Sequence, residues 1–123
     1  DYDTANFVQA APATVVGAVL GSIQRGGLLA RLRIWADTAA GAGESMTVAN
    51  IKKNGVIIGA PLTPMVLPAL TPAKTPIDYD LKTVFGAALL GVSDGDIITI
   101  DLTYVAGTPT LTNIRIDTLV AYG

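Results

Sequence analysis

The sequence predicts an all-β protein, folded as one antiparallel β-sandwich of about eight strands. Short segments rich in Val, Ile, Leu and Thr alternate with Gly, Pro, Asn and Asp along the chain. No segment keeps the 3.6-residue period of an amphipathic helix over a long stretch. With 123 residues, the chain has the size of a single domain. We therefore expect an extended N-terminal arm at residues 1–13 and a single β-sandwich domain at residues 14–123.

The N-terminal arm shows little alternation of apolar and polar residues. Its larger apolar side chains are Tyr2, Phe7 and Val8, and Pro12 lies near its end. Two interpretations remain open. The arm is either a frayed chain end, as is common in small domains, or a segment that reaches a neighbouring subunit. In the second case Tyr2, Phe7 and Val8 are candidate contact residues.

The first two strands of the sandwich are expected at residues 14–23 and 28–36, with a turn at Gly26-Gly27 between them. The second strand alternates regularly. Its side chains expected in the core are Leu28, Ala30, Leu32 and Ile34. Its opposite face carries Arg31, Arg33 and Trp35. We interpret Trp35 either as a cap on the sheet edge or as a partner contact, because Trp and Arg are enriched at binding hot spots.

The strand that begins near Met46 changes register along its length. Met46 and Val48 share one face, but Ile51 has the opposite parity. A β-bulge near residues 49–50 would restore the pattern. Asn54-Gly55, which follows, is the strongest turn signal in the chain and predicts a tight hairpin.

Residues 61–76 contain five of the seven prolines. Each proline removes a backbone donor, so a central strand is not expected here. The segment nevertheless carries Met65, Leu67 and Leu70, and an apolar loop of this length needs a surface to lie against. It is interpreted either as a long crossover folded over its own sandwich or as a contact with another subunit.

Alternation returns in the C-terminal part of the chain. We expect strands at residues 77–83, 98–104 and 114–122, and a helical turn or short strand at residues 84–90. A turn is expected at residues 93–96. Hairpins at both ends and a long crossover between them fit an antiparallel sandwich of the jelly-roll type.

The sequence lacks the residues that most catalytic and metal sites need. It contains no His and no Cys, which removes the commonest general base and the commonest transition-metal ligands. Asp94-Gly95-Asp96 matches part of a calcium loop, without the bidentate Glu. Asp78 and Asp80 have a spacing that suits paired carboxylates, but we expect them on a solvated face. We predict no enzyme activity, no cofactor and no metal site; a hydrolase that relies on Asp78 and Asp80 is the remaining catalytic alternative.

The charge pattern argues against nucleic-acid and membrane partners. The net charge is −2 and there is no basic stripe, although binding to nucleic acids or to anionic membranes usually requires one. Half of the residues are hydrophobic and only 15% are charged, which is few for the surface of a small monomer. One explanation is that part of the surface is buried against neighbouring subunits.

Three stretches carry a resemblance to a known group of proteins. They are the KKNG hairpin at residues 52–55, the turn and strand VSDGDIITIDLTY at residues 92–104, and the closing strand LTNIRIDTLV at residues 111–120. With the strands around them, residues 27–123 resemble the small jelly-roll modules of tailed-phage virions. These modules occur as capsid decoration (cement) proteins and as tail- or head-fibre domains.

The resemblance implies a non-enzymatic virion protein on the outer capsid surface, often a homotrimer. Such a protein binds the major capsid protein and stabilises the head by bridging its subunits. The alternative is a fibre domain that binds a receptor or a carbohydrate, with Trp35 as its aromatic candidate. The candidate partner contacts are Tyr2, Phe7, Val8, Trp35, Met65, Leu67 and Leu70.

Overall fold

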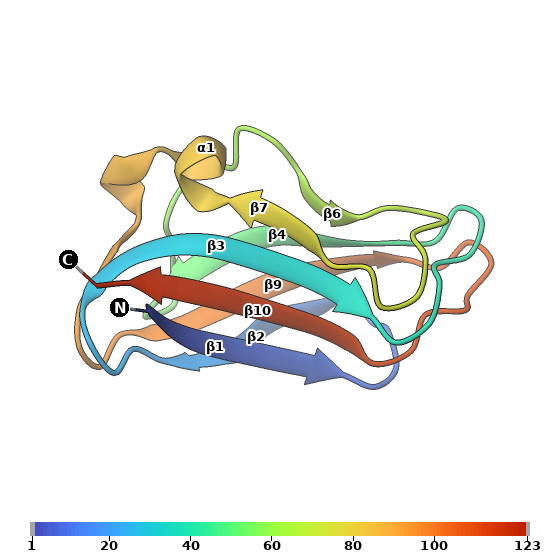
Figure 1. The fold of residues 1–123 in the computed structure, drawn as a ribbon, viewed down its shortest axis with the longest axis horizontal. Helices are drawn as coiled ribbons and strands as arrows, with labels where there is room; N and C mark the ends of the chain where they lie inside the picture. The colour runs from blue at the N-terminus through green and yellow to red at the C-terminus, as the bar shows by residue number, and fades with distance from the viewer. Residues whose placement is uncertain (1, 123) are drawn as a thin grey trace.

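The chain folds into a sandwich of two antiparallel β-sheets. The computed structural model describes residues 2–122, and the side chains of residues 6–122. Figure 1 shows the long strands running along the longest axis of the molecule, with one sheet behind the other. Each sheet has five strands. The prediction of an all-β antiparallel sandwich is therefore confirmed.

The two sheets are called A and B. Sheet A has the order β1 (Tyr2–Gln9), β10 (Ile114–Ala121), β3 (Gly27–Ala36) and β7 (Ile77–Asp80), with β8 (Gly91–Val92) also paired to β3. Sheet B has the order β2 (Val15–Ser22), β9 (Ile97–Val105), β4 (Ser45–Lys53) and β5 (Val56–Ile57), with β6 (Met65–Leu67) also paired to β4.

The chain crosses repeatedly from one sheet to the other. β1 lies in sheet A, β2 in sheet B, β3 in sheet A and β4 in sheet B, while the first and last strands, β1 and β10, are neighbours in sheet A. This order is that of a jelly roll, which combines two Greek keys in one sandwich. Within the described residues, eight strands have three or more residues, in agreement with the expected number, and β5 and β8 have two each.

The hydrophobic core lies between the sheets, because the strands alternate buried and exposed side chains. β10 alternates along its whole length, from buried Ile114 to half-buried Ala121. Both sheets supply fully buried residues, among them Leu32, Ile34, Met46, Val48, Ile98, Ile100, Ile114 and Ile116. The two sheets therefore each bury one face and expose the other.

The N-terminal segment is part of the sandwich and not a separate arm. β1 pairs with β10 without a break, from Tyr2 opposite Ala121 to Gln9 opposite Ile114. Phe7 packs partly against the core. The expectation of an extended arm at residues 1–13 is thus corrected, because Tyr2–Gln9 form an edge strand of sheet A.

Register shifts occur along several of the long strands, and those in β4 and β3 bear on the predicted pattern. In β4, Val48 lies opposite Leu102 and Asn50 opposite Asp101, so the bulge expected at residues 49–50 is confirmed. In β3, a second register shift leaves Ala30 without a partner on β10. As a result Leu29 is buried, whereas Leu28, which was expected in the core, is exposed. A bulge has this effect because one additional residue exchanges the two faces of a strand.

The strand expected at residues 77–83 ends early, at Asp80. The Asp80 carboxylate accepts a hydrogen bond from the backbone N–H of Lys82 at 3.1 Å and so caps the short helix α1 (Leu81–Phe85). Leu81, Val84 and Phe85 of this helix are buried. A 3₁₀ turn, η1 (Ala87–Leu89), follows, so the helical alternative for residues 84–90 is the correct one.

The proline-rich segment is a crossover between the two sheets. β6 pairs with β4 at the edge of sheet B, and the chain then runs to β7 in sheet A. The Tyr79 hydroxyl donates to the carbonyl of Val66 at 2.6 Å and accepts from its N–H at 3.0 Å, which joins β6 to β7. Of the two interpretations, the structure shows the crossover. No helix among the described residues is long and apolar enough to cross a membrane.

Candidate contact surfaces

The outer face of sheet A is charged. Its outward side chains include Arg31, Arg33, Trp35, Asp78, Arg115, Asp117 and Leu119. Arg33 Nε lies 2.8 Å from Asp78 Oδ1, and Arg115 Nη2 lies 3.3 Å from Asp37 Oδ2. The hydrogen bond from Arg115 lowers the pKa of the Asp37 carboxyl below its ordinary value. The Arg33–Asp78 pair is solvent-exposed, and exposed ion pairs contribute little to folding, whereas the Arg115–Asp37 pair is partly buried.

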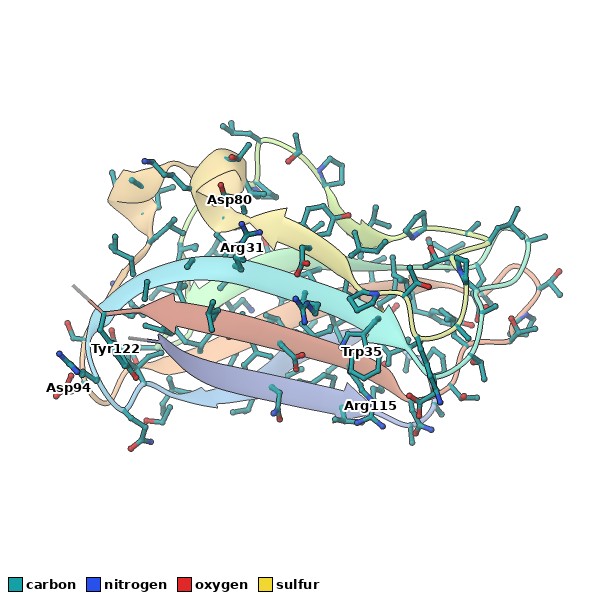
Figure 2. All side chains as sticks on the ribbon, viewed as in Figure 1. Arg31, Trp35, Asp80, Asp94, Arg115 and Tyr122 are labelled. Carbon is teal, nitrogen blue, oxygen red and sulfur yellow. The ribbon has the colours of Figure 1, made fainter. Side chains whose placement is uncertain are left out.

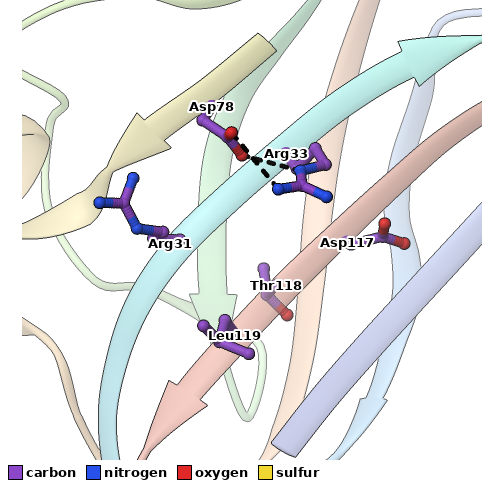
Figure 3. Close-up of a pocket in the computed structure, with 6 residues that line it drawn as sticks. All are labelled: Arg31, Arg33, Asp78, Asp117, Thr118 and Leu119. Atoms are coloured by element: carbon purple, nitrogen blue, oxygen red, sulfur yellow. Dashed lines mark hydrogen bonds and ion pairs between the residues drawn. The ribbon is translucent and has the colours of Figure 1, made fainter. Parts of the chain in front are cut away.

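A shallow hollow of about 150 Å³ lies on the same face. Figure 3 shows its lining residues, Arg31, Arg33, Asp78, Asp117, Thr118 and Leu119. Arg31 lies opposite Asp80 in the β3–β7 pair, as Arg33 lies opposite Asp78. Only the second pair forms an ion pair, because the Asp80 carboxylate caps α1 instead. The hollow therefore mixes both signs of charge over the apolar Leu119.

Trp35 lies at one end of this face, beside Arg115 (Figure 2). The Arg115 guanidinium carbon is 5.2 Å from the centre of the Trp35 ring, within the range of a cation–π contact. Trp35 lies directly opposite Arg115 in the β3–β10 register. One face of the Trp35 ring is thus covered by the chain itself.

The outer face of sheet B mixes exposed apolar side chains with threonines and a few charged or amide groups. Across the strands, Val19 lies opposite Thr99, and Thr99 opposite Lys52, which in turn lies opposite Ile57. A second row joins Val66, Thr47 and Thr103. The larger exposed apolar residues of these strands are Val16, Val19, Ile57, Ile97 and Val105. Clusters of exposed apolar side chains mark interaction sites more often than isolated ones do.

Among the described residues, one ion pair lies within this face. Lys52 Nζ is 3.0 Å from Asp101 Oδ1, and the two side chains are largely sheltered. Asp101 also accepts hydrogen bonds from the Gly17 N–H at 3.0 Å and from Asn50 Nδ2 at 2.9 Å. Burial acts to raise the pKa of Asp101, but the bonds from Asn50, Lys52 and Gly17 outweigh it and lower that pKa. This carboxylate therefore joins β2, β4 and β9.

Glu44, the only glutamate of the chain, is fully buried at one end of the sandwich. Its carboxylate accepts hydrogen bonds from the N–H groups of Gly41 (2.8 Å), Thr110 (2.9 Å) and Leu111 (3.1 Å), and from the Tyr104 hydroxyl. Burial acts to raise the pKa of Glu44, but these bonds lower it to about 2. The bond to Glu44 in turn raises the pKa of Tyr104 to about 12. Sequence analysis did not identify this residue, although a lone Glu among small residues was a visible signal.

Two of the residues expected to contact a partner are inside the core. Met65 and Leu67 are fully buried, because both side chains of β6 point into the core between the two sheets. A partner cannot reach them in this fold, and their assignment as contacts is corrected. The alternation of residues 65–67 does not show which face of β6 points into the core. Only the pairing of β6 with β4 decides this.

Of the other candidates, Val8 and Trp35 lie on either side of Arg115 on the outer face of sheet A. Phe7 and Trp35 are half-buried, and Val8 is exposed on the outer face of sheet A. Leu70 is exposed in the loop between β6 and β7. The side chain of Tyr2 lies outside the described residues. Phe7, which packs against the core, and Leu70, in the loop, do not join Val8 and Trp35 in one surface. The exposed apolar side chains of sheet B form a second candidate contact surface.

The carboxylates considered for chemistry serve the fold. Asp78 pairs with Arg33, and Asp80 caps α1. Asp94 accepts from the N–H of Gly26 at 2.6 Å, and Asp96 from the N–H of Ser93 at 2.8 Å. The bond from Ser93 and a further one from Asn54 lower the pKa of Asp96. Among the described residues, no group of three or more acidic side chains could hold a metal ion.

Comparison with known proteins gives no further constraint. No protein-family model and no curated protein sequence matches the chain.

Proposed function

We propose that the chain is a capsid decoration (cement) protein of a tailed phage. In this proposal it binds as a homotrimer to the outer surface of the head and bridges neighbouring major capsid subunits. Each copy stabilises the head because the interface it buries must be broken before the subunits can separate.

The observation that supports this most is the difference between the two outer faces. Sheet A presents charged side chains suited to solvent, whereas sheet B presents Val, Ile and Thr with one sheltered ion pair. A module that sits on a shell needs one face of each kind. The outer face of sheet B is therefore the docking face in this proposal.

Co-sedimentation with capsids that lack the chain tests the proposal. The wild-type protein is expected to bind and to raise the temperature at which the capsids break open. If it neither binds nor changes capsid stability, the proposal is wrong. Light scattering on the purified protein should give three times the molar mass of the chain, and a monomer that stays monomeric on the capsid contradicts the trimer.

Two matched variants identify the docking face. Val19 on β2 and Val8 on β1 are both valines on eight-residue edge strands, and their side chains are 57% and 49% exposed. Val19→Lys should abolish co-sedimentation, because it places a charge in an apolar interface, while Val8→Lys should leave it intact. If instead Val8→Lys abolishes co-sedimentation and Val19→Lys does not, the docking face is the outer face of sheet A.

A further inference from the structure

The Asn54-Gly55 turn, which joins β4 to β5, carries a chemically labile pair of residues. Asparagine is among the less durable side chains of proteins, because the backbone nitrogen of the next residue can attack its carboxamide carbon. Of the four asparagines in the chain, only Asn54 is followed by Gly, and the others precede Phe or Ile. A glycine nitrogen is the least hindered, since glycine has no side chain. Asn54 is therefore the asparagine of this chain most prone to deamidation.

The reaction has two steps and needs no reagent other than water. The Gly55 nitrogen forms a bond to Asn54 Cγ and loses its proton, while the bond from Cγ to Nδ2 breaks and ammonia leaves with that proton. Water then opens the cyclic imide at either of its two carbonyl carbons, which gives aspartate or isoaspartate at position 54. Asn54 and Gly55 are both exposed, so water reaches them.

The structure holds the Asn54 side chain by both of its polar atoms. Its Nδ2 donates to Asp96 Oδ1 at 2.9 Å, and its Oδ1 accepts from the N–H of Ile97 at 2.9 Å. The backbone N–H of Asn54 also donates to the carbonyl of Ile97, at 2.8 Å. These bonds join the turn to the start of β9 and leave the carboxamide with all of its partners on that strand and on the residue before it.

We propose that Asn54 is a deamidation site that its bonds to Asp96 and Ile97 keep unreactive, and that opening of this end of the sandwich makes it reactive. Closure of the imide ring moves the carboxamide onto the Gly55 nitrogen, so the carboxamide must first leave both partners. While the bonds hold, the reaction is slow. Once they break, Asn54 reacts as it does in the unfolded chain.

Conversion also hinders the turn from closing again. Aspartate at position 54 places a second carboxylate where Asn54 Nδ2 now lies 2.9 Å from Asp96 Oδ1, and two like charges at this distance repel each other. Isoaspartate adds a backbone carbon to a two-residue turn, in which Asn54 and Gly55 have φ of 52° and 82°. Turns of this kind depend on that backbone geometry. The site therefore keeps a one-way record of each opening.

Rates of conversion in the purified protein test this proposal. Peptide mass spectrometry measures aspartate and isoaspartate at position 54 over time. The folded wild type should convert at least about a hundredfold more slowly than the same protein in urea, because only opened molecules react. Asp96→Ala should convert about tenfold faster than the wild type when both are folded, because it removes a bond to a charged acceptor. In urea the two proteins should convert at equal rates.

Asp94→Ala is the matched control. It removes a carboxylate from the same turn, one that accepts from the Gly26 N–H at 2.6 Å, and it leaves the bonds of Asn54 in place. Its rate of conversion should equal that of the wild type. Asn54→Asp, which is the product itself, should lower the melting temperature by about 5 °C.

Three results would overturn the inference. The first is a wild type that converts as fast when folded as in urea, and this comparison holds even if Asp96→Ala fails to fold. The second is a folded Asp96→Ala that converts no faster than the wild type or than Asp94→Ala. The third is an unchanged melting temperature for Asn54→Asp, which would mean that the product closes the turn as well as asparagine does. All of these measurements use the purified chain, so they stand whether or not the protein binds capsids.

Discussion

Sheets A and B treat charged side chains in different ways. On sheet A the Arg33–Asp78 pair lies on the surface, with side chains 50% and 40% exposed. On sheet B the Lys52–Asp101 pair is sunk among neighbouring strands, with side chains 18% and 13% exposed. Glu44, at the start of β4, is buried completely. Sheet A thus has many charged side chains, each with few hydrogen bonds or ion pairs. Sheet B has few charged side chains, each held by several such contacts.

This difference implies a division of roles between the two sides. Charges that lie in water are weakly coupled to the fold, so the outer face of sheet A can vary at little cost to stability. Charges that are buried and multiply bonded fix the strands and loops around them, and removal of one partner leaves the others unsatisfied. A docking face keeps its shape if its charged side chains hold neighbouring strands together. Asp101 does this on sheet B through its bonds to Gly17, Asn50 and Lys52.

The largest effect on stability is expected for Glu44→Gln. The amide replaces one carboxylate oxygen by a donor that faces the N–H groups of Gly41, Thr110 and Leu111 or the Tyr104 hydroxyl. The free energy of unfolding should fall by about 3 kcal/mol, measured by urea denaturation. Asp37→Asn, which breaks the partly exposed pair with Arg115 at the same end of the molecule, is the control and should lose less. Equal losses would remove the distinction between buried and exposed charges.

The same carboxylate predicts a pH dependence. Its folded pKa of about 2 lies below the ordinary value of 4.5, so the unfolded chain binds the proton more readily. The stabilisation is complete above about pH 4.5 and is lost as the pH falls toward 2, by roughly 2 to 3 kcal/mol. Urea titrations of the wild type and Glu44→Gln between pH 7 and 2.5 isolate this contribution. Parallel curves for the two proteins would show that Glu44 is not its source.

A smaller loss is expected for Asp101 on sheet B. Asp101→Ala leaves the Gly17 N–H, the Asn50 amide and the sheltered Lys52 without their acceptor. The free energy of unfolding should fall by about 2 kcal/mol. Asp101→Asn keeps an oxygen for Gly17 and should lose about half as much. If both variants are as stable as the wild type, the Lys52–Asp101 pair does not stabilise the fold. The two sheets would then not differ in how much their ion pairs contribute to stability.

Local sequence signals predicted the parts of the fold that depend on neighbouring residues. The Asn54-Gly55 hairpin and the bulge at residues 49–50 follow from turn chemistry and from a break in alternation, and both are present. The bulge at Ala30 gave no such signal, because either Leu28 or Leu29 can fill a core position. Only pairing with β10 decides between them.

The candidate contact surfaces were harder to predict because they depend on non-local pairing. From the sequence, Met65 and Leu67 fit either a partner contact or the core. Pairing of β6 with β4 points both side chains into the core. Glu44 meets Thr110 and Leu111 across more than sixty positions of the sequence.

The smallest effect is expected for the Arg33–Asp78 pair, and it tests the other side of the comparison. A double-mutant cycle with Arg33→Ala and Asp78→Ala should give a coupling energy of about 0.5 kcal/mol at low salt, as is usual for exposed pairs. The coupling should decrease as salt is added, because solvent ions screen exposed charges. The same cycle with Lys52→Ala and Asp101→Ala on sheet B should give a larger coupling that responds less to salt. If the coupling energy on sheet A is as large as that on sheet B, the exposed ion pair also stabilises the fold. The charges of sheet B would then constrain the structure no more than those of sheet A.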